Sequence, residues 1–355
     1  MKNYKVFVRT LSVILVIVMT GLLVLYPDIG RSGVSNGLYM SGRVIIPSLF
    51  PFAFCVLFIM RSGILAYLKK IEPITRFIFG QSGDEFAVFV LSLIGGYPVG
   101  GRLIKELYDK KETNAKRAQI LLCYCVNAGP AFTIVAVGGA IFGSRTIGYI
   151  LLTSSIIASI IMAFIGRFAL KRNNGEFQKK AVVTTSIADN FVTSAADAAS
   201  SVFSICVFVI IFSVINAYMV GFSGGISFFK HLSNFVEVTS AVSRTKNIYY
   251  VSFLIGFSGI CVWLQILSAI SNIKINLILF VLSRIVHAAL SAMITFVCVK
   301  IFKPTLNTMT NGTIFSGSRY VSTVSLSVAM LAMVILFCIS LFSKKSCGSL
   351  LKDVI

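Results

Sequence analysis

The sequence predicts an all-α, polytopic transmembrane helical protein made of two inverted repeats that contain broken or re-entrant helices. The first observation behind this prediction is composition: of 355 residues, 57% are hydrophobic and only 12% are charged. Soluble domains carry about 25% charged residues. The second is that Lys and Arg lie in short clusters between apolar segments. The third is that each half contains an apolar segment interrupted by glycine.

The net charge of +20 is compatible at first sight with nucleic-acid binding. However, basic clusters between apolar segments are typical of cytoplasmic loops beside anionic lipid. We therefore expect membrane lipid as a partner and no nucleic acid. Most of the eight cysteines lie in apolar stretches without a CxxC pair, which favours buried hydrophobic side chains. Cys123 and Cys125 are weak candidates for soft metal ligands, because a two-residue spacing places them on different faces of a helix; no metal or cofactor is expected.

The apolar segments follow one another along most of the chain. They cover residues 10–26, 44–60, 86–101, 118–143, 147–166, 202–222, 248–271, 275–299 and 320–342. The first follows basic residues and has no small-x-small cleavage site, so residues 1–30 are expected to be a retained signal anchor. Residues 344–355 are expected to form a short basic tail. Residues 186–201 have an amphipathic pattern and are expected to lie along the membrane interface.

The segment 86–101 has basic clusters on both sides, in residues 69–76 and 102–117. Both flanks therefore look cytoplasmic, and a segment with both ends on one side must enter the membrane and return. Its sequence GGYPVGG, residues 95–101, provides a turn, because glycine tolerates positive φ and Pro98 blocks helix continuation. The alternative is a single kinked spanning helix.

The second half repeats this order of elements. The sequence SLIGGYPVGG, from Ser92, aligns with FLIGFSGICV, from Phe253, at an offset of 161 residues. Upstream, residues 45–60 correspond to residues 200–215. On this topology the first repeat (31–180) begins outside and the second (181–343) begins in the cytoplasm. Such inverted repeats are typical of secondary transporters.

Polar residues at membrane depth are candidates for function because they are costly without a partner. Asn127 precedes Gly129 and Pro130, which open a helix and free its carbonyls. Its amide is predicted to contact a solute or to make a helix-to-helix hydrogen bond. Glu237, with Thr239 close by, is predicted to bind a hydroxyl or a coupling cation, or else to lie at the outer surface beside Arg244.

The second glycine-broken segment contributes Ser258 and Gln265 as candidate lining residues. Arg284 and His287 are three residues apart and share one helical face. They are candidates for a proton-linked pair or an anion contact, and structural pairing with a carboxylate or backbone carbonyls is equally compatible. His231, the only other histidine, is expected in a loop, which gives a histidine metal site little support.

Two stretches carry a resemblance to a known family: LSLIGGYPVGGRLIKELYDKK and CYCVNAGPAFTIVAVGGAIFGS. They resemble the nucleoside-recognition (Gate) domain membrane proteins, and more closely the YlbJ family of sporulation integral membrane proteins. The resemblance implies paired Gate domains in the cell membrane of an endospore-forming bacterium. By position it implies a substrate-binding role for Gly95, Gly96, Tyr97, Pro98, Gly100, Asn127, Gly129 and Pro130, and for Glu237 and Thr239 in the second gate. The second hairpin, GFSGICVW, is less glycine-rich, so a symmetric substrate site is in doubt.

The expected function is therefore a transporter or gate that moves a small solute, nucleoside-like or ionic, by alternating access. The alternative is a non-transporting structural or assembly factor of the spore envelope. An enzyme is not expected, because no Ser/His/Asp set, HExxH or redox CxxC can be placed. The solute, the coupling ion and a homo-oligomeric state are left open.

Overall fold

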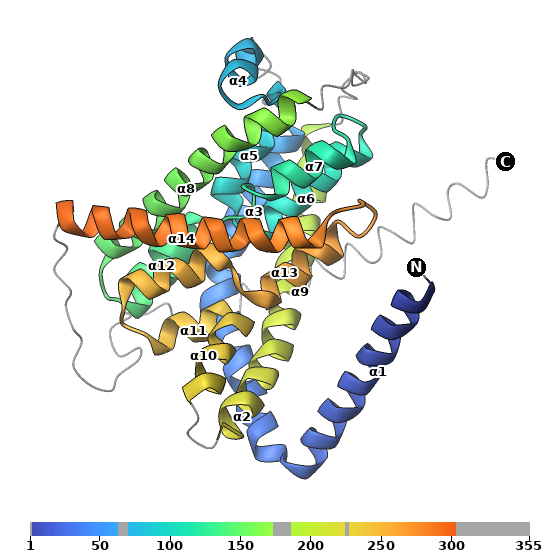
Figure 1. Cartoon of the computed structure of the whole chain (residues 1–355), viewed down its shortest axis with the longest axis vertical. Helices are drawn as coiled ribbons and strands as arrows, with labels where there is room; N and C mark the ends of the chain where they lie inside the picture. Colours follow the sequence, from blue (N-terminus) through green and yellow to red (C-terminus); the bar gives the residue numbers. More distant parts are fainter. Residues whose placement is uncertain (1, 63–69, 173–185, 224–226, 303–355) are drawn as a thin grey trace.

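The computed structural model describes residues 2–62, 70–172, 186–223 and 227–302. Within these residues every regular element is a helix, arranged as one helical bundle from which α1 projects (Figure 1). The elements are α1 (Lys2–Leu25), α2 (Pro27–Met40), η1 (Ser41–Ile45), α3 (Ile46–Arg61), α4 (Glu72–Phe79), α5 (Gly83–Gly95), α6 (Tyr97–Asp109), α7 (Ala115–Leu122), η3 (Ala131–Ile141), α8 (Arg145–Arg172), α9 (Ile187–Gly221), α10 (Ser227–Val236), α11 (Val238–Arg244), α12 (Ile248–Phe257), α13 (Gly259–Ala269) and α14 (Leu277–Phe302). The elements η1 and η3 are π-helical.

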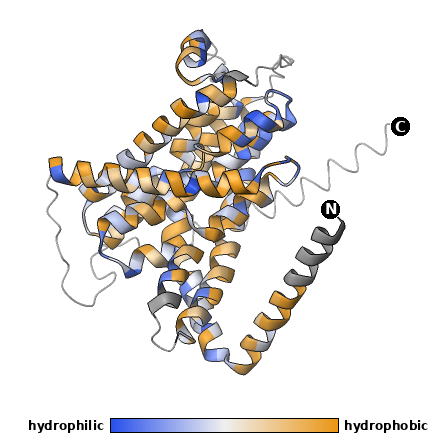
Figure 2. Cartoon of the chain, viewed as in Figure 1, coloured by the Kyte–Doolittle hydropathy of each residue, from blue (hydrophilic) through white to orange (hydrophobic). Residues whose placement is uncertain are grey.

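Several helices are long and apolar enough to cross a membrane. Five such stretches occur in the described part of the chain: Pro27–Arg61, Arg145–Leu170, Ile187–Gly221, Ile248–Ala269 and Leu277–Phe302. A sixth is reached if α4 and α5, which meet at 74°, count as one bent span. Hydrophobic residues cover most of these helices (Figure 2). The predicted all-α, polytopic membrane architecture is confirmed.

Helix α2 was not predicted from the sequence. It packs against α9 through glycines: a Cβ on Gly33 would lie 2.7 Å from the Cα atom of Val214, and one on Gly37 would lie 2.7 Å from the Cα atom of Ile210. Small residues at such an interface let two helix backbones approach closely. The expected boundary between residues 30 and 31 therefore falls inside a helix.

Three further predictions concern residues 186–201, His231 and the C-terminal segments. Residues 186–201 were expected to lie along the interface, but they form the first turns of α9, where Asp197 makes an ion pair with Arg61 on α3. These residues lead without interruption into the apolar part of α9, and their position along the membrane interface stays a prediction. His231 lies in α10 rather than in a loop. Residues 320–342 and 344–355 lie outside the described residues.

The first glycine-broken segment breaks at the predicted place. Helix α5 ends at Gly95 and α6 begins at Tyr97, and Gly96 between them has φ 84° and ψ −174°. That conformation is essentially restricted to glycine. The two helices pack along each other, so the chain reverses at this glycine. Each has 13 residues, about 20 Å at 1.5 Å per residue, which is shorter than the hydrocarbon core of a bilayer.

The second segment is also broken, but its path differs from the expectation. Ser258 (φ 75°) and Gly259 (φ 76°) separate α12 from α13. The two helices nevertheless form one candidate span of 22 residues, Ile248–Ala269, so the expected entry and return was wrong here. The physical reason is that the break is short. The Ser258 amide still donates to Leu254 O at 2.9 Å, and Trp263 Nε1 donates to Phe257 O at 2.8 Å, which satisfies the freed carbonyl.

A third break lies between α7 and η3, in residues 123–129. Asn127 and Gly129 fall in this non-helical stretch, and Pro130 has helical backbone angles directly before η3. The expectation that Gly129 and Pro130 open the helix here is confirmed.

Candidate functional site

The three chain breaks meet in the interior of the bundle. A Cβ on Gly96 would lie 3.2 Å from the amide nitrogen of Gly129, and one on Gly129 would lie 2.9 Å from Ile94 O. The Tyr97 hydroxyl donates a hydrogen bond of 2.6 Å to Ile255 O, just before the break in the other half. Residues far apart in the sequence are therefore joined at one point, and glycine at positions 96 and 129 permits the close approach.

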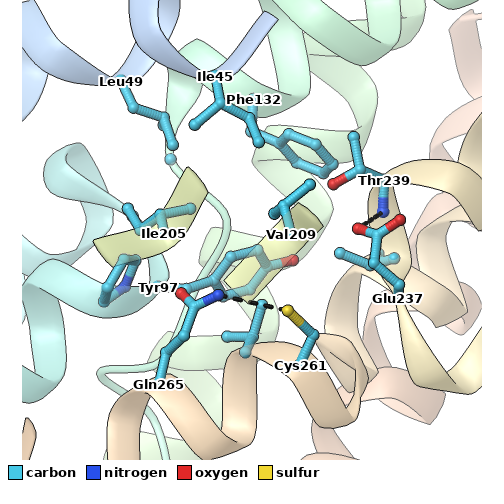
Figure 3. A pocket seen from close by; sticks show the side chains of 15 residues that line it. Ile45, Leu49, Tyr97, Phe132, Ile205, Val209, Glu237, Thr239, Cys261 and Gln265 are labelled. Atoms are coloured by element: carbon cyan, nitrogen blue, oxygen red, sulfur yellow. Dashed lines mark hydrogen bonds between the residues drawn. The ribbon is translucent and has the colours of Figure 1, made fainter. Parts of the chain in front are cut away.

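A narrow cavity of about 50 Å³ lies beside this point (Figure 3). Its wall is mostly apolar and includes Phe132 and Val209, with a few polar side chains. Among the residues predicted to bind substrate, Gly96, Tyr97, Pro98, Gly129, Glu237, Thr239 and Gln265 line this cavity. They come from the first break and the start of α6, the third break, the N-terminal end of α11 with its cap, and α13, so both halves of the chain contribute.

Other residues predicted to bind substrate do not line the cavity. Gly100 faces the third break, where a Cβ would lie only 2.0 Å from Cys125 O. A Cβ on Gly95 would lie 2.6 Å from Val99, which makes this position one of close packing within the hairpin. Pro130 precedes η3, and Ser258 is fully buried at the second break. The described cavity wall does not include Gly95, Gly100, Pro130 or Ser258.

Glu237 is held by the helix that follows it. It is 1% exposed, and its carboxylate accepts hydrogen bonds from Thr239 N (2.7 Å) and Ser240 N (2.6 Å), so it is the N-cap of α11. The alternative of a surface position beside Arg244 is wrong. The Arg244 guanidinium donates instead to Asn216 Oδ1 at 3.2 Å and to other polar groups of α10.

Arg284 fills the third break from the neighbouring helix α14. Its side chain is fully buried, and its guanidinium donates to Cys123 O and Val126 O. Breaking a helix frees carbonyl oxygens, which need donors when no water is present. Of the alternatives considered for Arg284, pairing with backbone carbonyls is therefore the one observed.

Asn127 and His287 belong to a hydrogen-bonded chain that joins four elements. Asn127 Nδ2 donates to Tyr124 O at 2.7 Å, and Ser159 Oγ on α8 donates to Asn127 Oδ1 at 2.7 Å. The same Ser159 oxygen lies 3.0 Å from His287 Nε2, and His287 Nδ1 lies 3.3 Å from Gly256 O on α12. The Asn127 amide thus forms a hydrogen bond to the neighbouring helix α8, and its contact with a solute stays a prediction.

Metal-ligating side chains do not gather in the described part of the chain. No group of three or more His, Cys, Asp or Glu side chains is placed there to hold an ion. Cys125 is buried, and the Cys123 thiol donates to Gln119 O at 3.3 Å within its own helix.

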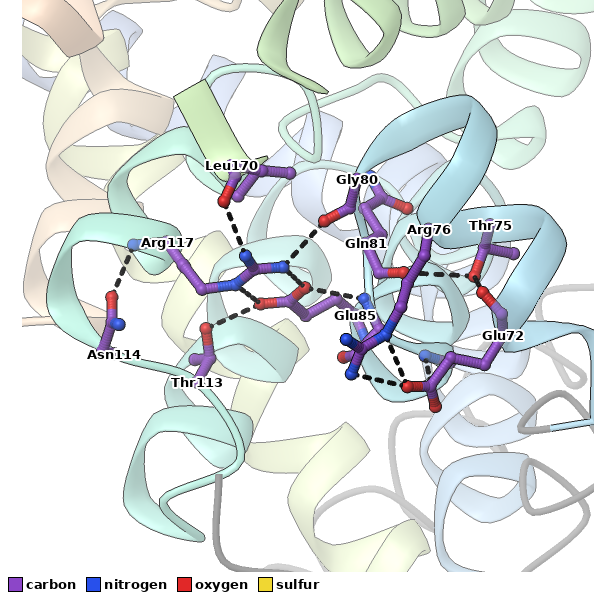
Figure 4. Close-up of polar contacts among 12 residues, drawn as sticks. Glu72, Thr75, Arg76, Gly80, Gln81, Glu85, Thr113, Asn114, Arg117 and Leu170 are labelled. Carbon is purple, nitrogen blue, oxygen red and sulfur yellow. Dashed lines mark hydrogen bonds and ion pairs between the residues drawn. The ribbon is translucent and has the colours of Figure 1, made fainter. Parts of the chain in front are cut away.

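A buried ion pair between Glu85 and Arg117 was not predicted from the sequence (Figure 4). Arg117 Nε donates to Glu85 Oε1 at 2.7 Å, and its other nitrogens donate to Glu85 Oε2, to Leu170 O (3.0 Å) and to Gly80 O (2.9 Å). The pair joins α5, α7, α8 and the turn after α4. A signal exists, because Ser82 and Glu85 form the S-x-x-E capping box at the start of α5.

Replacing Arg284 by methionine is expected to lower the free energy of unfolding by about 1–3 kcal/mol, because the carbonyls of Cys123 and Val126 lose their donors. Removal of a buried charge offsets part of that loss. The measurement is the Tm of the purified variant in detergent. Low concentrations of guanidinium should raise the Tm of this variant and not that of the unsubstituted protein.

Lys300→Met, an exposed basic residue on the same helix, is the matched control. If Arg284→Met were as stable as this control, the guanidinium would not hold the third break.

These observations define a polytopic α-helical membrane protein with a cavity that is lined by residues of two of its helix breaks. The chain is similar to "Sporulation integral membrane protein YlbJ" of Bacillus subtilis (strain 168), with 22% identity over 323 residues that cover 77% of this chain and 78% of the relative. No family model and no solved structure matches. The predicted resemblance to the YlbJ protein is confirmed, and the assignment of Gate domains stays a prediction.

Proposed function

We propose that this protein moves or gates a small solute across the cell membrane of an endospore-forming bacterium during sporulation. The observation that carries the proposal is the cavity, which brings together Tyr97, Glu237, Gln265 and other predicted binding residues from both halves. Ligand sites in transporters lie between repeats, where helices are discontinuous. The name of the Bacillus subtilis relative supports the link with sporulation.

Contacts between equivalent segments of the two halves support alternating access by two inverted repeats. Arg284 bonds to Cys123, and the two are separated by 161 residues, the same offset that aligns the two glycine-broken segments. Tyr97 bonds to Ile255 at a separation of 158 residues. Helix α6 also packs on α13, and α3 packs on α9. Equivalent positions of two repeats touch each other when they lie near a pseudo-two-fold axis.

A structural or assembly role in the spore envelope is the second candidate. It is favoured because the buried polar groups around the breaks form their hydrogen bonds within the chain. The Asn127 amide is bonded to Tyr124 O and to Ser159, and two guanidinium nitrogens of Arg284 donate to backbone carbonyls, so these contacts around the breaks form without a solute. A scaffold with this core would be stable without transporting anything.

Solute flux into liposomes distinguishes the two candidates. The purified protein is expected to admit monovalent cations or nucleosides above the rate of empty vesicles. Gln265→Leu is expected to reduce that flux by about tenfold or more, since one lost hydrogen bond in a desolvated site is worth about 1–3 kcal/mol. The control is Leu264→Ala, an exposed neighbour on the same helix that does not line the cavity.

The scaffold is supported instead if the folded protein passes none of these solutes and Gln265→Leu supports normal spore formation. Equal flux through Gln265→Leu and Leu264→Ala would contradict a role for this cavity in transport.

A further inference from the structure

The charge of the cavity wall limits what it can bind. Glu237 is the one charged side chain among the described residues that line it, and this lining contains no Lys, Arg or His. Figure 3 shows Glu237 with Thr239 on one side of the cavity and Gln265 with Cys261 on another. An anion here would meet a carboxylate without a compensating cation, which is costly away from water. The wall therefore disfavours phosphates, nucleotides and organic acids.

The polar atoms that remain available in the wall are mainly acceptors. The Tyr97 hydroxyl already donates to Ile255 O, and Gln265 Nε2 lies 3.4 Å from the Cys261 sulfur as a donor. The carboxylate of Glu237 accepts one backbone hydrogen bond on each oxygen, and a carboxylate has about four lone-pair sites. The Gln265 carbonyl oxygen and the Thr239 hydroxyl receive no hydrogen bond from the described residues. A ligand that donates hydrogen bonds or carries positive charge fits this set.

The Glu237 carboxylate forms no hydrogen-bonded ion pair within the described part of the chain. The Arg244 guanidinium is near enough for a charge–charge interaction with Glu237, but its hydrogen bonds go to Asn216 and to residues of α10. The Arg284 guanidinium donates to carbonyls of the third break. Glu237 is nevertheless only 1% exposed. A buried carboxylate is costly unless it is paired, and ionisable groups inside membrane proteins mark ion or substrate pathways.

The size of the cavity sets the size of the cation. A volume of about 50 Å³ has room for about three to five water molecules, at about 10–15 Å³ each. A divalent ion is a poor fit, because Ca²⁺ takes 6–8 oxygen ligands with several carboxylates. Here one carboxylate is present, and no cluster of three acidic, histidine or cysteine side chains was found in the described residues.

We propose that the cavity beside Glu237 binds a small monovalent cation of the ammonium type, with Glu237 as counter-ion and Thr239 and Gln265 as neutral oxygen ligands. This inference rests on the proposed function, for which it specifies the class of solute. The N–H groups of such a cation donate to the acceptors that the wall leaves open, and a methyl group fits against Phe132 and Val209.

Binding can be measured without transport, from the Tm of the full-length protein in detergent. Ammonium and methylammonium chloride are expected to raise the Tm in a saturable manner, relative to N-methylglucamine chloride at the same ionic strength. Thr239→Val and Gln265→Leu leave the carboxylate cap of α11 in place, and each is expected to weaken binding by about tenfold. Glu237→Gln is expected to abolish it, and Leu264→Ala is expected to match the unsubstituted protein.

The absence of any saturable shift with either cation would overturn the inference, as would an equal shift in the unsubstituted protein, Thr239→Val and Gln265→Leu. Stabilisation by sodium phosphate or acetate rather than by the ammonium salts would overturn it too. If nucleosides cross the membrane without any cation effect on the Tm, the inference fails while the proposed transport stands. If the cations bind but no solute crosses the membrane, the proposed transport is contradicted and the proposed cation site is supported.

Discussion

Replacing Gly100 by alanine is expected to destabilise the protein by about 3 kcal/mol or more, the upper end of the range for overpacking. A Cβ at this position would lie 2.0 Å from the backbone oxygen of Cys125, so a backbone segment would have to move. That segment is the third break, whose carbonyls at Cys123 and Val126 are held by Arg284. Yield of folded protein and Tm in detergent provide the measurement.

Gly42→Ala is the matched control for this substitution, because Gly42 is also helical and a Cβ there meets nothing within 4 Å. It is expected to be neutral or to stabilise by up to about 1 kcal/mol, through helix propensity. Equal stability of Gly100→Ala and Gly42→Ala would mean that α6 does not press against residues 123–126.

Replacing Arg117 by methionine is expected to lower the free energy of unfolding by about 3–5 kcal/mol, because an unpaired charge is left buried. Glu85 has no exposed surface, and Arg117 supplies two of the hydrogen bonds to its carboxylate. The same substitution removes the links from α7 to Leu170 O and Gly80 O. Denaturation of the purified variant measures the loss.

Replacing both partners by methionine is expected to cost less than replacing Arg117 alone, since the buried charge is then absent. The control is Arg76→Ala, which breaks an i,i+4 pair with Glu72 in which the arginine side chain is 61% exposed. Exposed pairs contribute about 0–1 kcal/mol. A loss for Arg117→Met no greater than that for Arg76→Ala would contradict the assignment of a buried clamp.

The positions of the three breaks could be predicted from the sequence because glycine and proline act locally. Gly96 takes a backbone conformation that other residues avoid, and Pro130 cannot continue a helix. The direction of the chain after a break is not determined by the residues at the break alone. Ser258 redirects α12 only slightly, whereas Gly96 reverses α5, and the difference depends on the neighbours of each helix.

Pairings across the bundle could not be predicted for the same reason. Arg117 was counted in a basic cluster typical of a cytoplasmic loop, and only the fold shows that Glu85 lies beneath it. For Asn127 and Arg284 the sequence allowed a contact with solute or with protein, because their side chains suit both. Ser159 and the carbonyl of Val126, to which these side chains bond in the structure, come from other elements. Helix α2 was missed because its buried glycines carry little hydrophobic signal, although their spacing at Gly30, Gly33 and Gly37 is typical of a close helix contact.

The claim that three chain breaks meet beside one cavity is tested most directly by a cryo-electron microscopy map of the full chain in lipid nanodiscs. Non-helical backbone is predicted at Gly96, at residues 123–129 and at Ser258, with the Tyr97 hydroxyl on Ile255 O and the Arg284 guanidinium on the carbonyls of the third break. A continuous helix through residues 115–141, or breaks that lie apart with Tyr97 turned away from α12, would contradict it.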